Sequence, residues 1–204
     1  YTTQFPTVEV NTSFYAIPAP ATLINWVEVA PPGFTFALKF PRAISHDKRL
    51  VNVAEESLAF LDALRSLGPA AAPAFLQLPP QLTRKSHGKP LADYLDWLAA
   101  QAPDLRIAVE VRAGDLMTAA FGAYVAERGF ALVLTARKGQ PDLYPIWLEL
   151  VQAGKTPPFA FIRWIGDDRN GPQGDRELQQ PRDAELATWA ERLAELAGYG
   201  LDVY

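Results

Sequence analysis

The chain contains no cysteine, one methionine and only two histidines among its 204 residues. Without thiols it cannot form a disulfide, a thiolate metal site or a cysteine nucleophile. No apolar run approaches the ~20 residues that cross a bilayer, and no signal-peptide pattern opens the chain. We therefore expect a soluble, cytoplasmic protein that has no membrane partner.

A basic excess is also missing. The 19 lysine and arginine residues are outnumbered by 23 aspartate and glutamate residues, which gives a net charge of −4. Because phosphate binders usually carry a positive excess, this balance disfavours a nucleic-acid partner. The sequence carries no signal for an oligomeric state.

Two catalytic loop motifs are absent as well. No Gly-x-Gly-x-x-Gly follows a predicted strand, so a dinucleotide phosphate loop is not expected. No Gly-x-Ser-x-Gly motif indicates a serine hydrolase. We expect no cofactor and assign no metal ligand, although a carboxylate metal site at Glu9 and Glu110 is conceivable.

What the sequence does show is a regular alternation of strand-like and helix-like segments. Strands are predicted over residues 7–11, 34–40, 74–78, 106–112, 130–135, 159–165 and 201–204, and helices over 20–29, from 52 to 67, from 90, over 116–128 and 142–152, and from 183. Such alternation is typical of a parallel sheet with helical crossovers. Of the open doubly wound sheet and the TIM-like (β/α) barrel, the missing phosphate loop favours the barrel, as a single domain over residues 1–204.

Both ends of this predicted barrel look cut. The chain starts at Tyr1 without an initiator methionine, and it stops in a strand-like run that ends at Tyr204. We expect the first strand of the barrel, and the segment after the last strand, to be missing. The residues between 166 and 182 are predicted to form a long polar loop, either a solvated connection or a lid.

Polar side chains gather at the C-terminal ends of the predicted strands. These residues are Glu9, Asn11, Lys39, Gln77, Glu110, Arg112 and Arg163. A parallel barrel brings such positions together at one mouth, where barrel enzymes place their chemistry. The sequence therefore predicts a site at the C-terminal mouth.

Two interpretations of these charges stay open. Glu9 and Glu110 could be an acid/base pair beside an anion clamp of Lys39, Arg112 and Arg163, since Arg offers a bidentate fork to carboxylate or phosphate. The same charges could equally neutralise one another as a structural network, because a lone buried charge is very costly.

Three further side chains belong to the prediction. His46 follows the second predicted strand and is a candidate general acid or base, or else a solvated loop histidine. Tyr15 could hydrogen-bond a ligand at the mouth or simply pack there. His87 lies in a polar loop and is predicted to be solvated.

Several segments, taken together, resemble the YecE-like family of TIM-barrel proteins of unknown function. They are Trp26 and residues 5–15 (FPTVEVNTSFY), 31–36 (PPGFTF), 39–46 (KFPRAISH), 76–80 (LQLPP), 109–112 (VEVR) and 161–163 (FIR). The resemblance implies a barrel fold and a site at its mouth, but no established reaction. Ala113, Thr135 and Ile165 replace a histidine, an aspartate and a histidine that the family tends to have, which removes possible acids, bases or ligands.

Three functions remain as hypotheses. The first is an enzyme that acts on a small polar or anionic metabolite, with Glu9, Glu110 and His46 as catalytic candidates. The second is a non-catalytic anion-binding barrel that uses Asn11, Tyr15, Lys39, Gln77, Arg112 and Arg163 for binding. A nucleic-acid-processing protein is the third and is disfavoured by the acidic balance.

Overall fold

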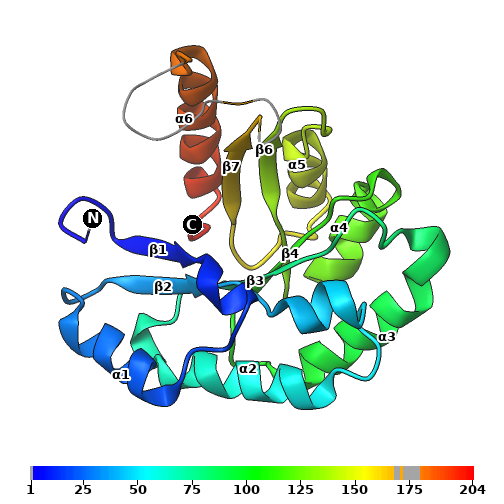
Figure 1. The fold of residues 1–204 in the computed structure, drawn as a ribbon. Coiled ribbons are helices and arrows are strands. Elements are labelled where there is room, and N and C mark those ends of the chain that lie inside the picture. The colour runs from blue at the N-terminus through cyan, green and yellow to red at the C-terminus, as the bar shows by residue number, and fades with distance from the viewer. Residues whose placement is uncertain (1, 168–170, 172–179) are drawn as a thin grey trace.

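The computed structural model describes residues 2–167, 171 and 180–204, in which parallel strands alternate with helices (Figure 1). The strands are β1 (Thr7–Val10), β2 (Thr35–Leu38), β3 (Ala74–Gln77), β4 (Ile107–Glu110), β5 (Ala131–Leu132), β6 (Leu134–Arg137) and β7 (Ile162–Gly166). The α-helices are α1 (Pro20–Val29), α2 (Ala54–Ser66), α3 (Arg84–Gln101), α4 (Ala119–Ala126), α5 (Tyr144–Gln152) and α6 (Asp183–Gly198). The polar connection predicted over residues 166–182 falls largely on residues 168–170 and 172–179, which lie outside the described residues.

The prediction of a closed TIM-like barrel is wrong. The described strands form three separate parallel sheets, with the orders β1-β2, β3-β4-β5 and β6-β7. A barrel requires a hydrogen-bonded ladder that continues around the whole ring. Here only isolated bridges join β2 to β3, at Phe36–Ala71 and Lys39–Phe75, so the ladder is broken there.

A second break lies at Val133, between β5 and β6. The Val133 amide donates to Val109 on β4 at 2.9 Å, and the next amide, that of Leu134, donates to Phe161 at 2.9 Å. The extended stretch that contains β5 and β6 is therefore hydrogen-bonded first within the sheet β3-β4-β5 and then within the sheet β6-β7. Within the described residues, β1 pairs with β2 alone, and the predicted strand over 201–204 is reduced to a bridge between Val203 and Ala160.

Several helix starts differ from the sequence prediction, and two of the differences involve capping. Asn52 does not cap α2, because it adopts a left-handed conformation (φ 53°) and the helix begins at Ala54 without a side-chain cap. Instead, a capping box forms at the start of α3, where the Thr83 and Ser86 side chains each satisfy a backbone amide of the other residue. This cap starts α3 at Arg84, and a kink at His87, whose backbone is not helical (φ −134°, ψ 17°), separates this first turn from the part of α3 that contains the predicted start at Pro90.

Side-chain alternation along the strands divides the core into two parts. Phe36, Leu38 and Leu76 pack outward against the helices in the larger cluster. A smaller inner cluster contains Ala37, Ala72, Phe75, Ala108, Ala131, Val133, Phe159 and Phe161. Since strand side chains alternate with period two, the inner row continues from Ala37 to Lys39, from Ala108 to Glu110 and from Phe161 to Arg163.

The inner face of the sheets is therefore apolar at its base and charged toward the strands' C-terminal ends. This arrangement positions the site described below. None of the helices within the described residues has both the length and the apolar character needed to cross a membrane.

Candidate functional site

Five of the predicted charged residues lie together on the inner face. We call Glu9, Lys39, Glu110, Arg112 and Arg163 the ionic cluster. Glu9 comes from β1, Lys39 directly follows β2, Glu110 ends β4 and Arg163 lies in β7. Residues from all three sheets thus meet in one group, although no barrel closes around them.

Arg163 links the two carboxylates of the ionic cluster. Its Nε and Nη2 donate to Glu9 Oε2 and Oε1 at 2.7 and 2.6 Å, and Nη1 donates to Glu110 Oε2 at 2.5 Å. The guanidinium carbon also lies 4.4 Å from the centre of the Phe75 ring. Burial alone would lower the pKa of Arg163, but the hydrogen bonds and charges of Glu9 and Glu110 outweigh it and raise the pKa. All three of its nitrogens are bonded to carboxylates, which is the geometry of a structural network.

Glu9 is held in its ionised form by the same contacts. Burial pushes the pKa of Glu9 upward, but the hydrogen bonds and charge of Arg163 more than offset that effect. The Asn11 amide donates to Glu9 Oε1 at 2.7 Å, and the charge of Lys39 adds a smaller contribution. The pKa of Glu9 therefore lies below its usual value of 4.5.

Glu110 is completely buried, and its second oxygen faces Arg112. Arg112 Nε lies 2.5 Å from Glu110 Oε1, yet the angle is unsuitable for a hydrogen bond, so neither atom has a hydrogen-bond partner within the described part of the chain. Thr135 on β6 is aligned with Arg163 on β7 and is 5 % exposed, and its hydroxyl is likewise without a partner there. Buried polar atoms of this kind are rare in folded proteins and often belong to sites that bind something else.

Lys39 differs from the other members of the ionic cluster, because within the described residues its ammonium forms no ion pair. Its Nζ lies 4.3 Å from the centre of the Phe14 ring and 5.8 Å from that of Phe75. Burial lowers the pKa of Lys39, and the positive charge of Arg163 lowers it further, while the two carboxylates act in the opposite direction.

The backbone of Lys39 is fixed by a serine from the neighbouring segment. Ser13 lies in the short helix η1 (Asn11–Phe14), and its hydroxyl is completely buried. The Ser13 Oγ accepts the Lys39 amide at 2.9 Å and lies 2.8 Å from the Lys39 carbonyl and 2.7 Å from that of Val10. The position from which the lysine side chain extends is therefore well defined.

His46 lies beside Lys39 but in a helical turn, η2 (Ala43–Asp47), rather than in a loop. Its Nδ1 is 2.8 Å from the Ser45 hydroxyl, and its ring meets Phe14 edge-on with centroids 5.0 Å apart. Burial lowers the pKa of His46 below 6.5, and the charges of Lys39 and Arg42 lower it further. A histidine that is neutral near pH 7 can accept a proton.

The remaining predicted residues are less closely engaged. Gln77 is half-buried and aligned with Glu110 in the sheet. Tyr15 is 78 % exposed, and its ring meets the edge of Phe14 at 5.3 Å. His87, predicted to be solvated, is half-buried, and its Nδ1 lies 2.7 Å from the Ser86 hydroxyl.

Three residues of this region were missed by the sequence analysis. Phe75 could have been found, because it precedes Gln77 by two positions and so shares the inner face. Phe14 and Ser13 lie beyond the end of β1, in η1, where strand periodicity no longer indicates direction. Among the described residues, no three His, Cys, Asp or Glu side chains are grouped so that they could hold a metal ion.

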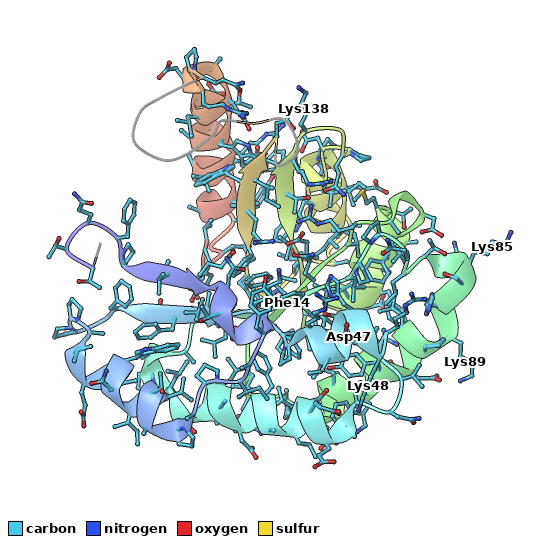
Figure 2. The ribbon with its side chains drawn as sticks, in the orientation of Figure 1. Phe14, Asp47, Lys48, Lys85, Lys89 and Lys138 are labelled. Carbon is cyan, nitrogen blue, oxygen red and sulfur yellow. The ribbon has the colours of Figure 1, made fainter. Side chains whose placement is uncertain are left out.

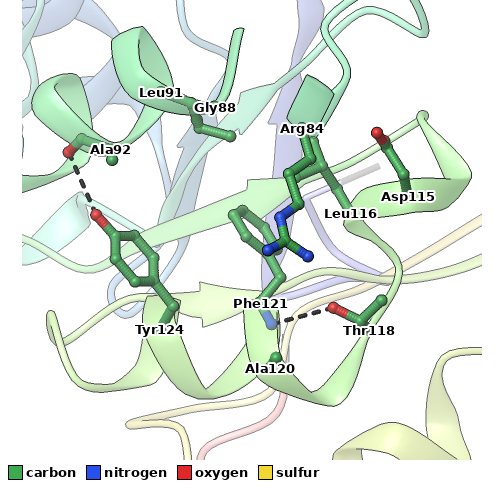
Figure 3. A pocket seen from close by; sticks show the side chains of 10 residues that line it. All are labelled: Arg84, Gly88, Leu91, Ala92, Asp115, Leu116, Thr118, Ala120, Phe121 and Tyr124. Carbon is green, nitrogen blue, oxygen red and sulfur yellow. Dashed lines mark hydrogen bonds between the residues drawn. The ribbon is translucent and has the colours of Figure 1, made fainter. Parts of the chain in front are cut away.

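Two cavities in the described structure are lined by no member of the ionic cluster. One, of about 370 Å³, lies between α3 and α4 and is lined by Arg84, Leu91, Asp115 and Tyr124, among others (Figure 3). Another, of about 500 Å³, lies at the ends of β6 and β7 against α6. Thr135 lines the second cavity and is also the neighbour of Arg163, so this cavity adjoins the cluster.

Comparisons with known proteins bear on the identity of this fold. The profile of the family described as "Protein of unknown function DUF72" matches residues 1–204. The UPF0759 protein YecE of Escherichia coli (strain K12) is 37 % identical over 79 residues, which cover 39 % of this chain and 29 % of that protein. The UPF0759 protein YunF of Bacillus subtilis (strain 168) is 26 % identical over 224 aligned positions, covering 100 % of this chain and 77 % of that protein. The alignment with YecE thus spans less than a third of that relative.

Two solved structures have a similar fold. A DUF72 family protein of Enterococcus faecalis V583 superposes with a TM-score of 0.77 at 22 % identity, covering 100 % of this chain and 82 % of the other. A DUF72 family protein of Thermotoga maritima MSB8 gives 0.74 at 20 % identity, covering 98 % and 76 %. At these identities the likeness concerns the fold alone.

Proposed function

Because the chain belongs to the DUF72 family of proteins of unknown function, as its resemblance to YecE-like proteins indicated, we propose a role from the site itself: the ionic cluster binds a small anionic metabolite. The observation that carries this proposal is Lys39, a half-buried ammonium with no ion pair in the described part of the chain.

The charge balance of the cluster supports an anion. Lys39, Arg112 and Arg163 contribute three positive charges, against two negative charges from Glu9 and Glu110. Arg163 neutralises Glu9 through a bidentate pair and also bonds Glu110. A carboxylate or phosphate near Lys39 would balance the remaining charge, and a charge-assisted hydrogen bond in such surroundings is short and strong.

Within this proposal Arg163 organises the site rather than meeting the ligand. Its three nitrogens already bond Glu9 and Glu110, which leaves only the second hydrogen on each Nη for another acceptor. Arg112 is the second contact that we propose: its Nε is occupied by Glu110 Oε1 at 2.5 Å, but its Nη atoms make no hydrogen bond within the described residues.

A catalytic role is the second candidate, and one observation favours it. His46 has a lowered pKa and lies next to Lys39, so a neutral imidazole stands beside the proposed anion. It would act as a general base on a ligand held by Lys39. The present geometry supports anion binding more directly than any particular reaction.

Thermal unfolding with added anions tests the binding proposal. We expect phosphate, malonate or succinate to raise the melting temperature, because a ligand that binds only the folded state stabilises it in proportion to RT ln(1 + [L]/Kd). Lys39→Met should abolish the shift, whereas the matched surface variant Lys85→Met should retain it. If Lys85→Met loses the shift as completely as Lys39→Met, or if no anion shifts the wild-type protein, the proposal is wrong.

A further inference from the structure

We propose that Lys39 forms an imine with the carbonyl carbon of a small 2-oxo acid, so that the ionic cluster binds its ligand covalently. The inference rests on the proposed anion site and specifies its ligand: the carboxylate of the 2-oxo acid is the anion, and the adjacent carbonyl is the group that reacts.

Lys39 has the surroundings that a nucleophilic lysine needs. A lysine becomes nucleophilic in a hydrophobic pocket or beside another cation, since both favour the uncharged amine. Here burial and the Arg163 guanidinium, which lies against the Phe75 ring, favour the uncharged amine, whereas the ring faces of Phe14 and Phe75, 4.3 and 5.8 Å from Nζ, favour the ammonium. No carboxylate of the described residues holds the ammonium in an ion pair.

The lysines elsewhere on the chain provide the contrast. Lys48, Lys89, Lys138 and Lys155 each pair with an acidic side chain, and their own side chains are 47 to 83 % exposed. Figure 2 shows Lys85, Lys89 and Lys138 at the periphery, whereas Phe14, whose ring lies against Lys39, is near the middle of the view. Lys85 also lacks an ion pair within the described residues, but it is exposed, so burial is what distinguishes Lys39.

The charges facing Lys39 fit the same role. Its pKa is lowered first by burial and then by Arg163, and is opposed by the two carboxylates. The charged and titratable groups around it are Arg163, Glu110, Glu9, Arg112 and His46. A lowered pKa leaves more of the uncharged amine at neutral pH, which is the form that attacks a carbonyl.

The proposed step balances without a co-reactant. The lone pair of Lys39 Nζ attacks the carbonyl carbon and forms a C–N bond, which gives a carbinolamine. The former carbonyl oxygen then leaves as water together with the two amine hydrogens, and a C=N bond remains. The carboxylate of the 2-oxo acid is unchanged and stays available to the Nη atoms of Arg112, which make no hydrogen bond within the described structure.

Reductive trapping tests this inference. The protein is incubated near neutral pH with glyoxylate and sodium cyanoborohydride, and its peptides are then examined by mass spectrometry. We expect the Lys39 peptide to gain one carboxymethyl group several-fold faster than those of Lys85 and Lys89, and excess malonate to protect it. Equal or slower labelling of Lys39 would overturn the proposal.

A conservative variant separates covalent chemistry from anion binding. Lys39→Arg keeps the positive charge but cannot form an imine, so it should lose trapping while phosphate still raises its melting temperature. Lys85→Arg is the matched control and should trap normally at Lys39. If wild-type Lys39 is not trapped but phosphate stabilises the protein, the imine is wrong and anion binding stands. If propionaldehyde labels Lys39 as fast as glyoxylate does and malonate gives no protection, the 2-oxo acid class is overturned.

Discussion

The Ser13 hydroxyl accepts the backbone amide of Lys39 at 2.9 Å and lies 2.8 Å from the carbonyl of the same residue. A hydroxyl has one hydrogen, so it donates either to this carbonyl or to that of Val10 at any moment. Ser13 therefore connects the end of β1 to the residue that follows β2, and it does so at the lysine on which the proposed function depends.

Replacing Ser13 with Ala should lower the free energy of unfolding by about 1–3 kcal/mol, because it leaves the Lys39 amide buried without its acceptor. Urea denaturation measures the loss. Ser66→Ala is the matched control, since Ser66 makes an exposed hydrogen bond to Asp62, and its change should stay within about 0.5 kcal/mol. Equal losses in the two variants would contradict the role of Ser13.

Replacing Arg163 with Met should be strongly destabilising. Glu110 is completely buried and would lose its hydrogen bond to Nη1, and breaking a buried ion pair by removing one partner costs about 3–5 kcal/mol. The free energy of unfolding from urea denaturation checks this loss.

A double-mutant cycle identifies the cause of that loss. Adding Glu110→Gln to Arg163→Met removes the buried unpaired charge, so the double variant should be more stable than the sum of the single changes indicates. Simple additivity would show that Arg163 stabilises the protein through contacts other than Glu110.

Glu9 should contribute to acid sensitivity. Its pKa in the folded protein lies below 4.5, because the hydrogen bonds and charge of Arg163 outweigh the effect of burial. As pH falls below 4.5, the unfolded chain takes up this proton first, so the stabilisation is present above 4.5 and is lost as pH falls through the folded-state pKa. The stability difference between wild type and Glu9→Gln, measured by urea denaturation across this range, should shrink with falling pH. A constant difference would contradict the assignment.

His46 should make the free energy of unfolding depend on pH in a higher range than Glu9 does. Its pKa in the folded protein lies below 6.5, chiefly because of burial and then because of Lys39. As pH falls below 6.5, the unfolded chain becomes protonated first, and the folded protein loses stability until pH reaches the folded-state pKa. His46→Gln should remove this part of the pH dependence. The imidazole resonances of His46 in a two-dimensional NMR titration report its folded-state pKa directly, and a midpoint above 6.5 would refute the prediction.

The order of strands and helices could be predicted from the sequence, but the closure of the sheet could not. Periodicity reports which residues alternate between faces, and so which ones share a side, as Ala108 does with Glu110 and Phe161 with Arg163. It contains no information on whether neighbouring strands complete their hydrogen bonds. The change of partner at Val133 depends on tertiary packing, and nothing in the run of apolar residues around it marks the break.

The candidate site, like the fold, could be predicted from the sequence only in part. Strand ends indicated which charges would gather, since parallel strands share one edge. They did not indicate that Arg163 would bond both carboxylates while Lys39 formed no ion pair within the described residues, because that outcome depends on side-chain reach across sheets. Likewise, Ser13 and Phe14 became neighbours of Lys39 only because η1 folds back after β1.

The pairing of Glu9 with Arg163 has a mechanical consequence. Among the described residues β1 is hydrogen-bonded to β2 alone, and β7 is hydrogen-bonded to β6, yet Glu9 of β1 grips Arg163 of β7 through two bonds. This ion pair therefore connects the first sheet to the last through side chains. A ligand that draws Glu9 away from Arg163 would leave β1 held mainly by its pairing with β2, and the amide hydrogens of that pairing would then exchange with solvent more rapidly.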